Sequence, residues 1–225
     1  MESPSHFAQI IVGTFVALLP LINPFAAAPT FLAITEGDTP ERRLQQLTKA
    51  CIYMVAILVS FLIAGRFIME FFGISLPGLR IAGGMLVVGI GWRMLMGSGE
   101  QGVHSEHANP EARAKPDISF SPLAMPMLSG PGSIAVTLGF TSLASGWIDY
   151  IAIILGILGV AALTYFTLRL SSKVVLVIGL NGMNALTKIM GFLLVCVGIE
   201  FVVNGVVGVL TGPELLGVLR KDGVR

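Results

Sequence analysis

The chain has 225 residues, of which 54% are hydrophobic and 12% are charged, and its formal net charge is +1. A soluble domain carries about 25% charged residues, so this composition excludes an ordinary water-soluble protein. With a mean hydropathy of +0.85, the chain is predicted to be an all-α membrane protein that lies in the lipid bilayer, and no nucleic-acid partner is expected.

Six stretches of the sequence are long and apolar enough to cross a bilayer, which takes about 20 residues of α-helix. In chain order they cover residues 10–34, 50–69, 79–96, 122–143, 148–168 and 186–210. The first stretch has no basic segment before it and is longer than the apolar part of a signal peptide, so we interpret it as a membrane span. Cys51 and Cys196 fall inside these stretches and are interpreted as small apolar core residues.

Two segments, in the first and fourth stretches, share one spacing of prolines. PLINPFAAAP begins at Pro20 and PLAMPMLSGP begins at Pro122, so three prolines recur with a shift of 102 residues. A second match, RIAGGMLVV from Arg80 against KIMGFLLVC from Lys188, has a shift of 108 residues. Three spans per repeat reverse the direction of the second copy. The sequence therefore predicts six transmembrane helices in two inverted three-helix repeats, with a broken first helix in each repeat.

The predicted organisation has four parts. Residues 1–96 form the first three-helix repeat, 97–119 a flexible cytoplasmic linker, 120–212 the second three-helix repeat and 213–225 a C-terminal tail. Lys and Arg are more frequent in the first, third and fifth connections than on the other side, which predicts that both termini are periplasmic. His104, Glu106 and His107 in the linker match no standard metal-ligand spacing, so neither a metal nor a cofactor is expected.

A broken helix within a membrane exposes backbone groups that can bind a small solute. Free amides at the start of one half-helix attract a carboxylate, and free carbonyl groups at the end of the other attract an ammonium group. These two poles suit a zwitterion, and the small residues around both breaks favour a small substrate. The predicted substrate-binding residues are Asn23, Pro24, Ser129, Gly130, Pro131 and Gly132. The alternative, which is favoured for any single proline, is a kink in a packed helix.

Four polar residues in the spans are candidates for coupling or gating. Glu200 is the carboxylate well inside a predicted span, and Asn204 lies four residues later on the same helical face. One interpretation of Glu200 is a proton carrier or cation ligand, which would couple transport to H⁺ or Na⁺, and the other is a hydrogen-bonded packing residue. Arg80 and Lys188 begin corresponding helices, where they either anchor the helix at the interface or gate opposite faces.

Four motifs carry a resemblance to a known family. PLINP near the N-terminus, FGISLPGLRIAGGMLVV in the middle, SPLAMPMLSGPGSI in the second half and KIMGFLLVCVGIEF near the end resemble the MarC family of bacterial inner-membrane proteins. The resemblance runs from about residue 10 to about residue 210. It implies a six-span secondary transporter of small neutral amino acids, such as glycine or alanine, in the bacterial inner membrane.

Two other functions are compatible with the sequence. One is a passive channel or an exporter of another small solute, and the other is a stress-associated membrane protein that transports nothing. An enzyme is not expected, because the sequence contains no nucleophile paired with a base, no metal cluster and no phosphate-binding loop. The sequence does not determine the substrate, the direction of transport, the coupling ion or the oligomeric state.

Overall fold

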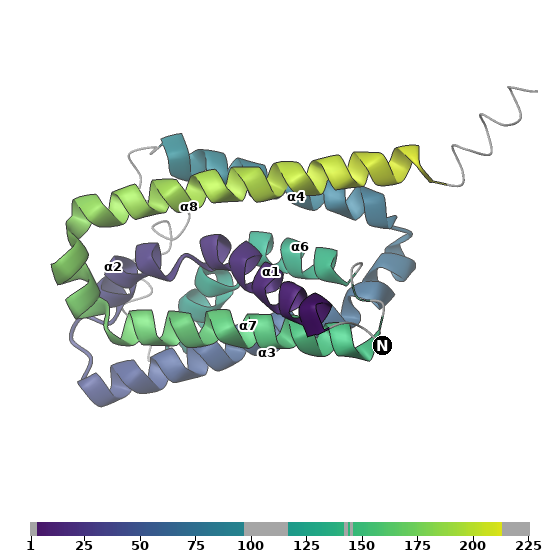
Figure 1. Ribbon diagram of the computed structural model, residues 1–225. Coiled ribbons are helices and arrows are strands. Elements are labelled where there is room, and N and C mark those ends of the chain that lie inside the picture. Colours follow the sequence, from purple (N-terminus) through teal and green to yellow (C-terminus); the bar gives the residue numbers. More distant parts are fainter. Residues whose placement is uncertain (1–3, 97–116, 142–143, 145, 213–225) are drawn as a thin grey trace, which may run out of the picture.

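The structure is a computed structural model that describes residues 4–96, 117–141, 144 and 146–212, and these residues are almost entirely helical, with no strand among them. In chain order the helices are α1 (Pro4–Ile22), α2 (Pro24–Ile34), α3 (Pro40–Phe72), α4 (Leu76–Met96), the π-helix η1 (Ser119–Leu128), α6 (Pro131–Phe140), α7 (Trp147–Arg169) and α8 (Ser171–Leu210). Figure 1 shows an elongated bundle in which α4 and α8 lie together along one side.

Five helices in the described part of the chain are long and apolar enough to cross a membrane. They are α1, α3, α4, α7 and the Asn181–Leu210 part of α8. Helices η1 and α6 form a sixth crossing if they are counted as one span with a bend of 63°. The described residues of every predicted apolar stretch are thus mainly helical, and the all-helical fold with several candidate membrane spans is confirmed. The predicted linker and tail lie largely outside the described residues.

Helix α8 begins earlier than its apolar stretch predicts. The sequence predicted a span from residue 186, whereas α8 begins at Ser171 and runs through a kink at Gly179. Gly179 has φ 69° and ψ 165°, a backbone conformation that residues with a Cβ atom rarely adopt. The segment between α7 and the last span is therefore helical with a kink at Gly179, whereas the sequence predicted a connection outside the span.

The first break lies between α1 and α2 at Asn23, the residue before Pro24. Proline disfavours the α-helical region for the residue before it. Asn23 has φ 38° and ψ 67°, in the left-handed region that asparagine tolerates better than most residues. Pro20 and Pro29 lie inside α1 and α2 without ending either helix. The first three-proline motif therefore breaks the chain at its middle proline.

The second three-proline motif interrupts the helix at each of its prolines. The residues before these prolines are Ser121, Met125 and Gly130, and all three have extended backbone angles. The chain bends by 63° at the last of them, between η1 and α6. Met125 aligns with Asn23 under the shift of 102 residues. The two motifs thus share one interruption, and the second motif adds two more.

Helices α4 and α8 pack antiparallel with their backbones in contact. A Cβ atom added at Gly84 would lie 2.6 Å from the carbonyl oxygen of Gly198, and one added at Gly91 would lie 2.6 Å from that of Gly191. Because residue numbers rise along α4 as they fall along α8, the two helices run in opposite directions, as Figure 1 also shows. Small residues permit such close helix contacts in membranes.

The spans differ in how much of their surface the bundle covers. Half of the most apolar window of α7 is buried, compared with 17% of the window in α8. Helix α7 therefore lies inside the bundle and α8 lies at its edge. Cys51 of α3 is buried as predicted, whereas Cys196 is exposed on α8. The predicted core location is wrong for Cys196 because α8 buries only the face that meets its neighbours.

Candidate functional site

Asn23 occupies the first break and is 1% exposed. Its side-chain Oδ1 accepts a hydrogen bond from the amide of Ala26 at 3.3 Å, which caps the start of α2. Its Nδ2 group has no hydrogen-bond partner among the described residues. Leaving a buried donor unpaired costs about 1–3 kcal/mol, so the hydrogen-bonding capacity of this N–H group is unused in the structure. Pro24, which follows it, is buried and has no N–H group to offer.

Ser129 at the second break is fully buried and already donates its hydroxyl. The hydroxyl donates to the carbonyl oxygen of Ala124 at 2.7 Å, and the Ser129 amide donates to the same oxygen at 2.8 Å. The sequence prediction assigned this hydroxyl to the substrate, whereas the structure uses its proton to close the end of η1. The hydroxyl oxygen keeps the capacity to accept a further hydrogen bond.

The start of α6 provides uncapped backbone amides directly after the second break. Gly130 is the N-cap residue and no side chain caps the helix, while Pro131 takes the first helical position. The amides of Gly132 and Ser133 belong to the first turn, which has no acceptor within its own helix. The helix dipole adds a partial positive charge at this end. The start of α6 therefore carries unpaired backbone amides and a partial positive charge, and anion binding there stays a prediction.

The two breaks adjoin each other in the fold. A Cβ atom added at Gly132 would lie 2.9 Å from Cδ2 of Leu21, two residues before Asn23, and 2.7 Å from Cδ1 of Ile90. The first turn of α6 thus packs against the last turn of α1, with α4 beside both. A Cβ atom at position 132 would require the side chains of Leu21 and Ile90 to move.

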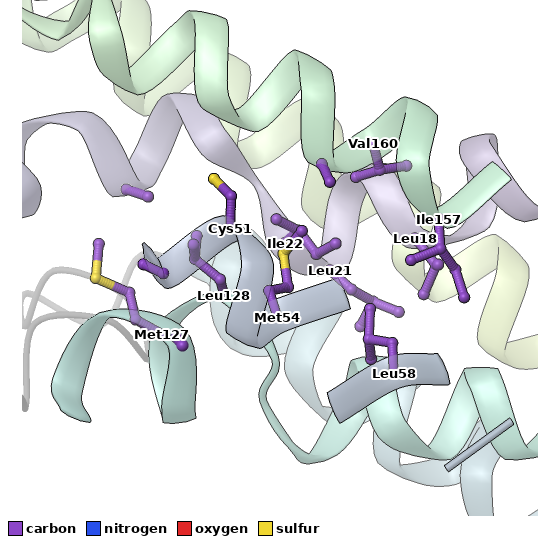
Figure 2. Packing of buried hydrophobic residues seen from close by; sticks show 14 of the residues in the cluster. Leu18, Leu21, Ile22, Cys51, Met54, Leu58, Met127, Leu128, Ile157 and Val160 are labelled. Carbon is purple, nitrogen blue, oxygen red and sulfur yellow. The ribbon is translucent and has the colours of Figure 1, made fainter. Parts of the chain in front are cut away.

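The surroundings of the first break are apolar. Figure 2 shows the side chains of Ile22, Met54 and Leu128, from α1, α3 and η1, in one buried cluster. None of the three has exposed surface. Hydrogen bonds are stronger in such surroundings than in water. The few polar groups at the breaks are therefore set in an environment where a hydrogen bond to them would be strong.

Glu200 and Asn204 form the contact that their spacing predicts. Nδ2 of Asn204 donates to Oε1 of Glu200 at 2.9 Å. Both side chains are exposed on α8, whereas Asn23 and Ser129 are buried. The structure therefore does not bring this pair together with the two breaks.

Arg80 and Lys188 lie toward opposite ends of the α4–α8 pair. Arg80 is half-buried near the start of α4. Lys188 is exposed on α8, one turn before Gly191, which packs against Met94 near the end of α4. The prediction that both residues begin helices is wrong for Lys188, because α8 already begins at Ser171. Neither residue is part of the breaks themselves, and a gating role stays a prediction.

The structure contains a buried acidic residue, Asp149, that the sequence did not identify as a candidate. Asp149 lies in the first turn of α7 with no exposed surface, and its Oδ1 lies 3.9 Å from Nδ1 of His6 in α1. A carboxylate in the first turn is stabilised by the helix dipole. Asp149 falls at the edge of its apolar stretch, and a sequence does not tell whether a helix end is covered by a neighbour.

Asp117 fixes the start of the second broken helix. Its carboxylate accepts hydrogen bonds from the hydroxyl and from the amide of Ser119, the latter at 2.9 Å, and it lies 3.3 Å from Nζ of Lys49 in α3. The bonds from Ser119, followed by the charge of Lys49, lower the pKa of Asp117 to about 2. An ionised Asp117 therefore connects η1 to α3 at neutral pH.

An open cavity of 430 Å³ lies where α3 turns into α4. It is lined by Arg66, Met69, Glu70, Gly73, Ile74, Ser75, Leu76, Thr141 and Ala144. Thr141 follows α6 and donates its hydroxyl to the carbonyl oxygen of Leu62 at 3.4 Å. The cavity is thus at the C-terminal end of α6, about 15 Å along that helix from the second break.

Comparison with known proteins places the chain among membrane proteins of one family. The sequence profile described as "MarC family integral membrane protein" matches residues 8–210. The "UPF0056 inner membrane protein MarC" of Citrobacter koseri is 37% identical over 219 residues, which cover 91% of this chain and 96% of the relative. Proteins of the same name from Salmonella typhimurium and Escherichia coli O1:K1 / APEC are 37% and 38% identical with the same coverage. No solved structure matches the chain.

Proposed function

Because the chain belongs to the MarC family of integral membrane proteins, we propose that it is a multi-pass inner-membrane carrier of small neutral amino acids such as glycine and alanine. The relatives are named as inner-membrane proteins, which supports the location. The substrate class is inferred from the chemistry of the two breaks.

The observation that carries the proposal is the unpaired Nδ2 group of the buried Asn23. This donor lies at a break that adjoins the uncapped first turn of α6, so N–H groups from two elements approach the same region. Together they suit a substrate carboxylate. The oxygen of Leu19 accepts from the amide of Asn23 at 2.9 Å. The carbonyl groups after Leu19 have no donor within α1, and we propose that they accept from the substrate ammonium group.

The size of the site supports a small side chain on the substrate. Ala27 and Ala28 in α2 are fully buried, and Gly132 lies where a Cβ atom would meet side chains of α1 and α4. A large substrate side chain would have to displace these packed groups. Glycine and alanine would require the smallest displacement.

Alternating access between two inverted repeats is the mechanism that we propose. Helices α4 and α8 carry the second sequence match and run antiparallel, with Gly84 against Gly198 and Gly91 against Gly191. Corresponding helices of two inverted repeats would be oriented in this way. An even total of six spans would place both termini on the same side, and the positive-inside rule favours the periplasm.

Counterflow in proteoliposomes tests the proposal. Vesicles preloaded with unlabelled glycine, alanine or a larger amino acid would be given the labelled substrate, with and without sodium or proton gradients. We expect saturable exchange of glycine and alanine. Asn23→Gly keeps the left-handed backbone but removes the amide, so its apparent affinity should fall about fivefold, the equivalent of one hydrogen bond. Asn181→Ala, at an exposed asparagine of α8, serves as the control and should leave affinity unchanged.

Each alternative gives a different result in the same assay. Flux that does not saturate would indicate a passive channel, and absence of flux for every amino acid would indicate a protein that does not transport them. Normal affinity in Asn23→Gly would place the substrate away from the first break.

A further inference from the structure

The outer face of α8 carries a continuous row of exposed side chains. With alternating steps of four and three residues, the row consists of Ile189, Leu193, Cys196, Glu200, Val203, Val207 and Leu210. Two parallel helices remain in contact along a row with this spacing. Asn204 lies beside the row and is hydrogen-bonded to Glu200. The opposite face of α8 is occupied by α4, through Gly191 and Gly198.

A polar pair on this face would be energetically unfavourable if the face contacted lipid. Glu200 lies ten residues before Leu210, the end of α8, which corresponds to about 15 Å of helix and half the thickness of a hydrocarbon core. Acidic residues at such depth almost always face protein or a water-filled cavity, because exposure to lipid costs several kcal/mol. The apolar neighbours in the row would be stable against lipid, so Glu200 and Asn204 are the residues that call for a protein partner.

We propose that this face binds a second copy of the chain, with two α8 helices parallel and related by a two-fold axis. Such symmetry brings each residue of the row opposite itself. Asn204 has a second N–H group and a carbonyl oxygen beyond its bond to Glu200, and Glu200 has a second oxygen. The Asn204 amide of one protomer can therefore donate to the carboxyl group of Glu200 in the other, and the exchange is reciprocal. The pair thus complements itself, which favours a copy of the same chain over an unrelated protein.

Oxidative cross-linking in native membranes tests the interface with a cysteine that the chain already has. Cys196 lies in the row, whereas Cys51 is buried in α3. Copper-phenanthroline should produce a disulfide-linked dimer of the wild-type protein on a non-reducing gel, and Cys196→Ser should abolish it. In the Cys196→Ser background, Val207→Cys should restore the dimer, because position 207 belongs to the row. Ile199→Cys is the matched control, since Ile199 is 51% exposed but points about 100° away from Glu200.

A second pair of variants tests the polar contact itself. Glu200→Leu should reduce dimerisation on the order of threefold to tenfold, measured by single-molecule photobleaching in bilayers of varying protein density, because it removes the interhelical hydrogen bonds. Glu200→Gln keeps hydrogen-bonding groups and should dimerise like the wild type. A monomeric wild-type protein, equal cross-linking at positions 199 and 207, or unchanged dimerisation of Glu200→Leu would each overturn the proposal.

Discussion

Alanine at Gly198 should separate α4 from α8 and destabilise the protein. The added Cβ atom would lie 2.7 Å from the carbonyl oxygen of Gly84 and 2.8 Å from the amide nitrogen of Val88. Optimal contacts of carbon atoms are about 3.5–4 Å, so the helices would have to move apart on the order of 1 Å. Both obstructing atoms are backbone, and no side-chain rotation relieves the contact. Overpacking of this kind costs about 1–3 kcal/mol.

Gly89→Ala is the matched control on the same pair of helices. Nothing lies within 4 Å of a Cβ atom at Gly89. Alanine there should stabilise helix α4 by about 0.5–1 kcal/mol, because it restricts the unfolded chain without any new clash. Gly198→Ala gains the same stabilisation from the restricted unfolded chain, which offsets part of the free-energy cost of overpacking. The two variants should therefore differ by about 2 kcal/mol in the free energy of unfolding.

Reversible unfolding in mixed micelles, followed by the fluorescence of Trp92 in α4 and Trp147 in α7, measures this difference. The double variant Gly84→Ala/Gly198→Ala should lose less than the sum of the single losses, because both methyl groups act on one contact. A Gly198→Ala protein as stable as Gly89→Ala would refute the close backbone packing of α4 and α8.

Substitutions at three further positions have expected effects on stability or transport. Ser129→Ala should lower the free energy of unfolding by about 1 kcal/mol, because the hydroxyl bond to Ala124 is lost, and Ser129→Thr, which restores a hydroxyl, should recover it; equal stability of all three proteins would contradict the assignment. The pKa of Asp117 is about 2 in the folded protein, below its ordinary value of 3.8. The ionised carboxylate therefore stabilises the fold above about pH 4, and this stabilisation is lost as the pH falls towards 2. Asp117→Asn should remove this pH-dependent part from unfolding curves recorded between pH 5 and 2, and an unchanged pH profile would contradict the lowered pKa. Glu200→Gln should retain the wild-type pH dependence of transport, because Glu200 lies on the outer face of α8, away from the breaks; loss of proton-driven accumulation with intact exchange would instead identify it as the proton carrier.

The helices and their interruptions could be predicted because both follow from local chemistry. Apolar stretches of the right length must become helices in a bilayer, since no other open structure satisfies the backbone there. Proline disfavours the helical conformation for the residue before it, and Asn23, Met125 and Gly130 are all non-helical. Pro20 and Pro29 do not break their helices, which shows that packing can hold a proline inside a helix as a tolerated kink.

The direction in which each residue faces could not be predicted. Around α8 nearly every position is apolar, so no amphipathic pattern separates an inner face from an outer one. The choice is made by Gly191 and Gly198, whose contact with α4 turns Glu200 and Cys196 outward. Such contacts join residues about 100 positions or more apart, and a single sequence gives no signal that pairs them.

Asparagine at position 23 combines three requirements of the first break. Glycine would adopt the left-handed backbone at less cost but could not cap α2, whereas aspartate would cap α2 and offer no N–H group. Asparagine tolerates the backbone, its Oδ1 accepts from Ala26, and its Nδ2 remains free. The atoms that build the break and the atom proposed to bind the substrate are therefore different atoms of one side chain. A binding site can arise in this way from the same residue that interrupts the helix, without burying a charged side chain at the centre of the bilayer.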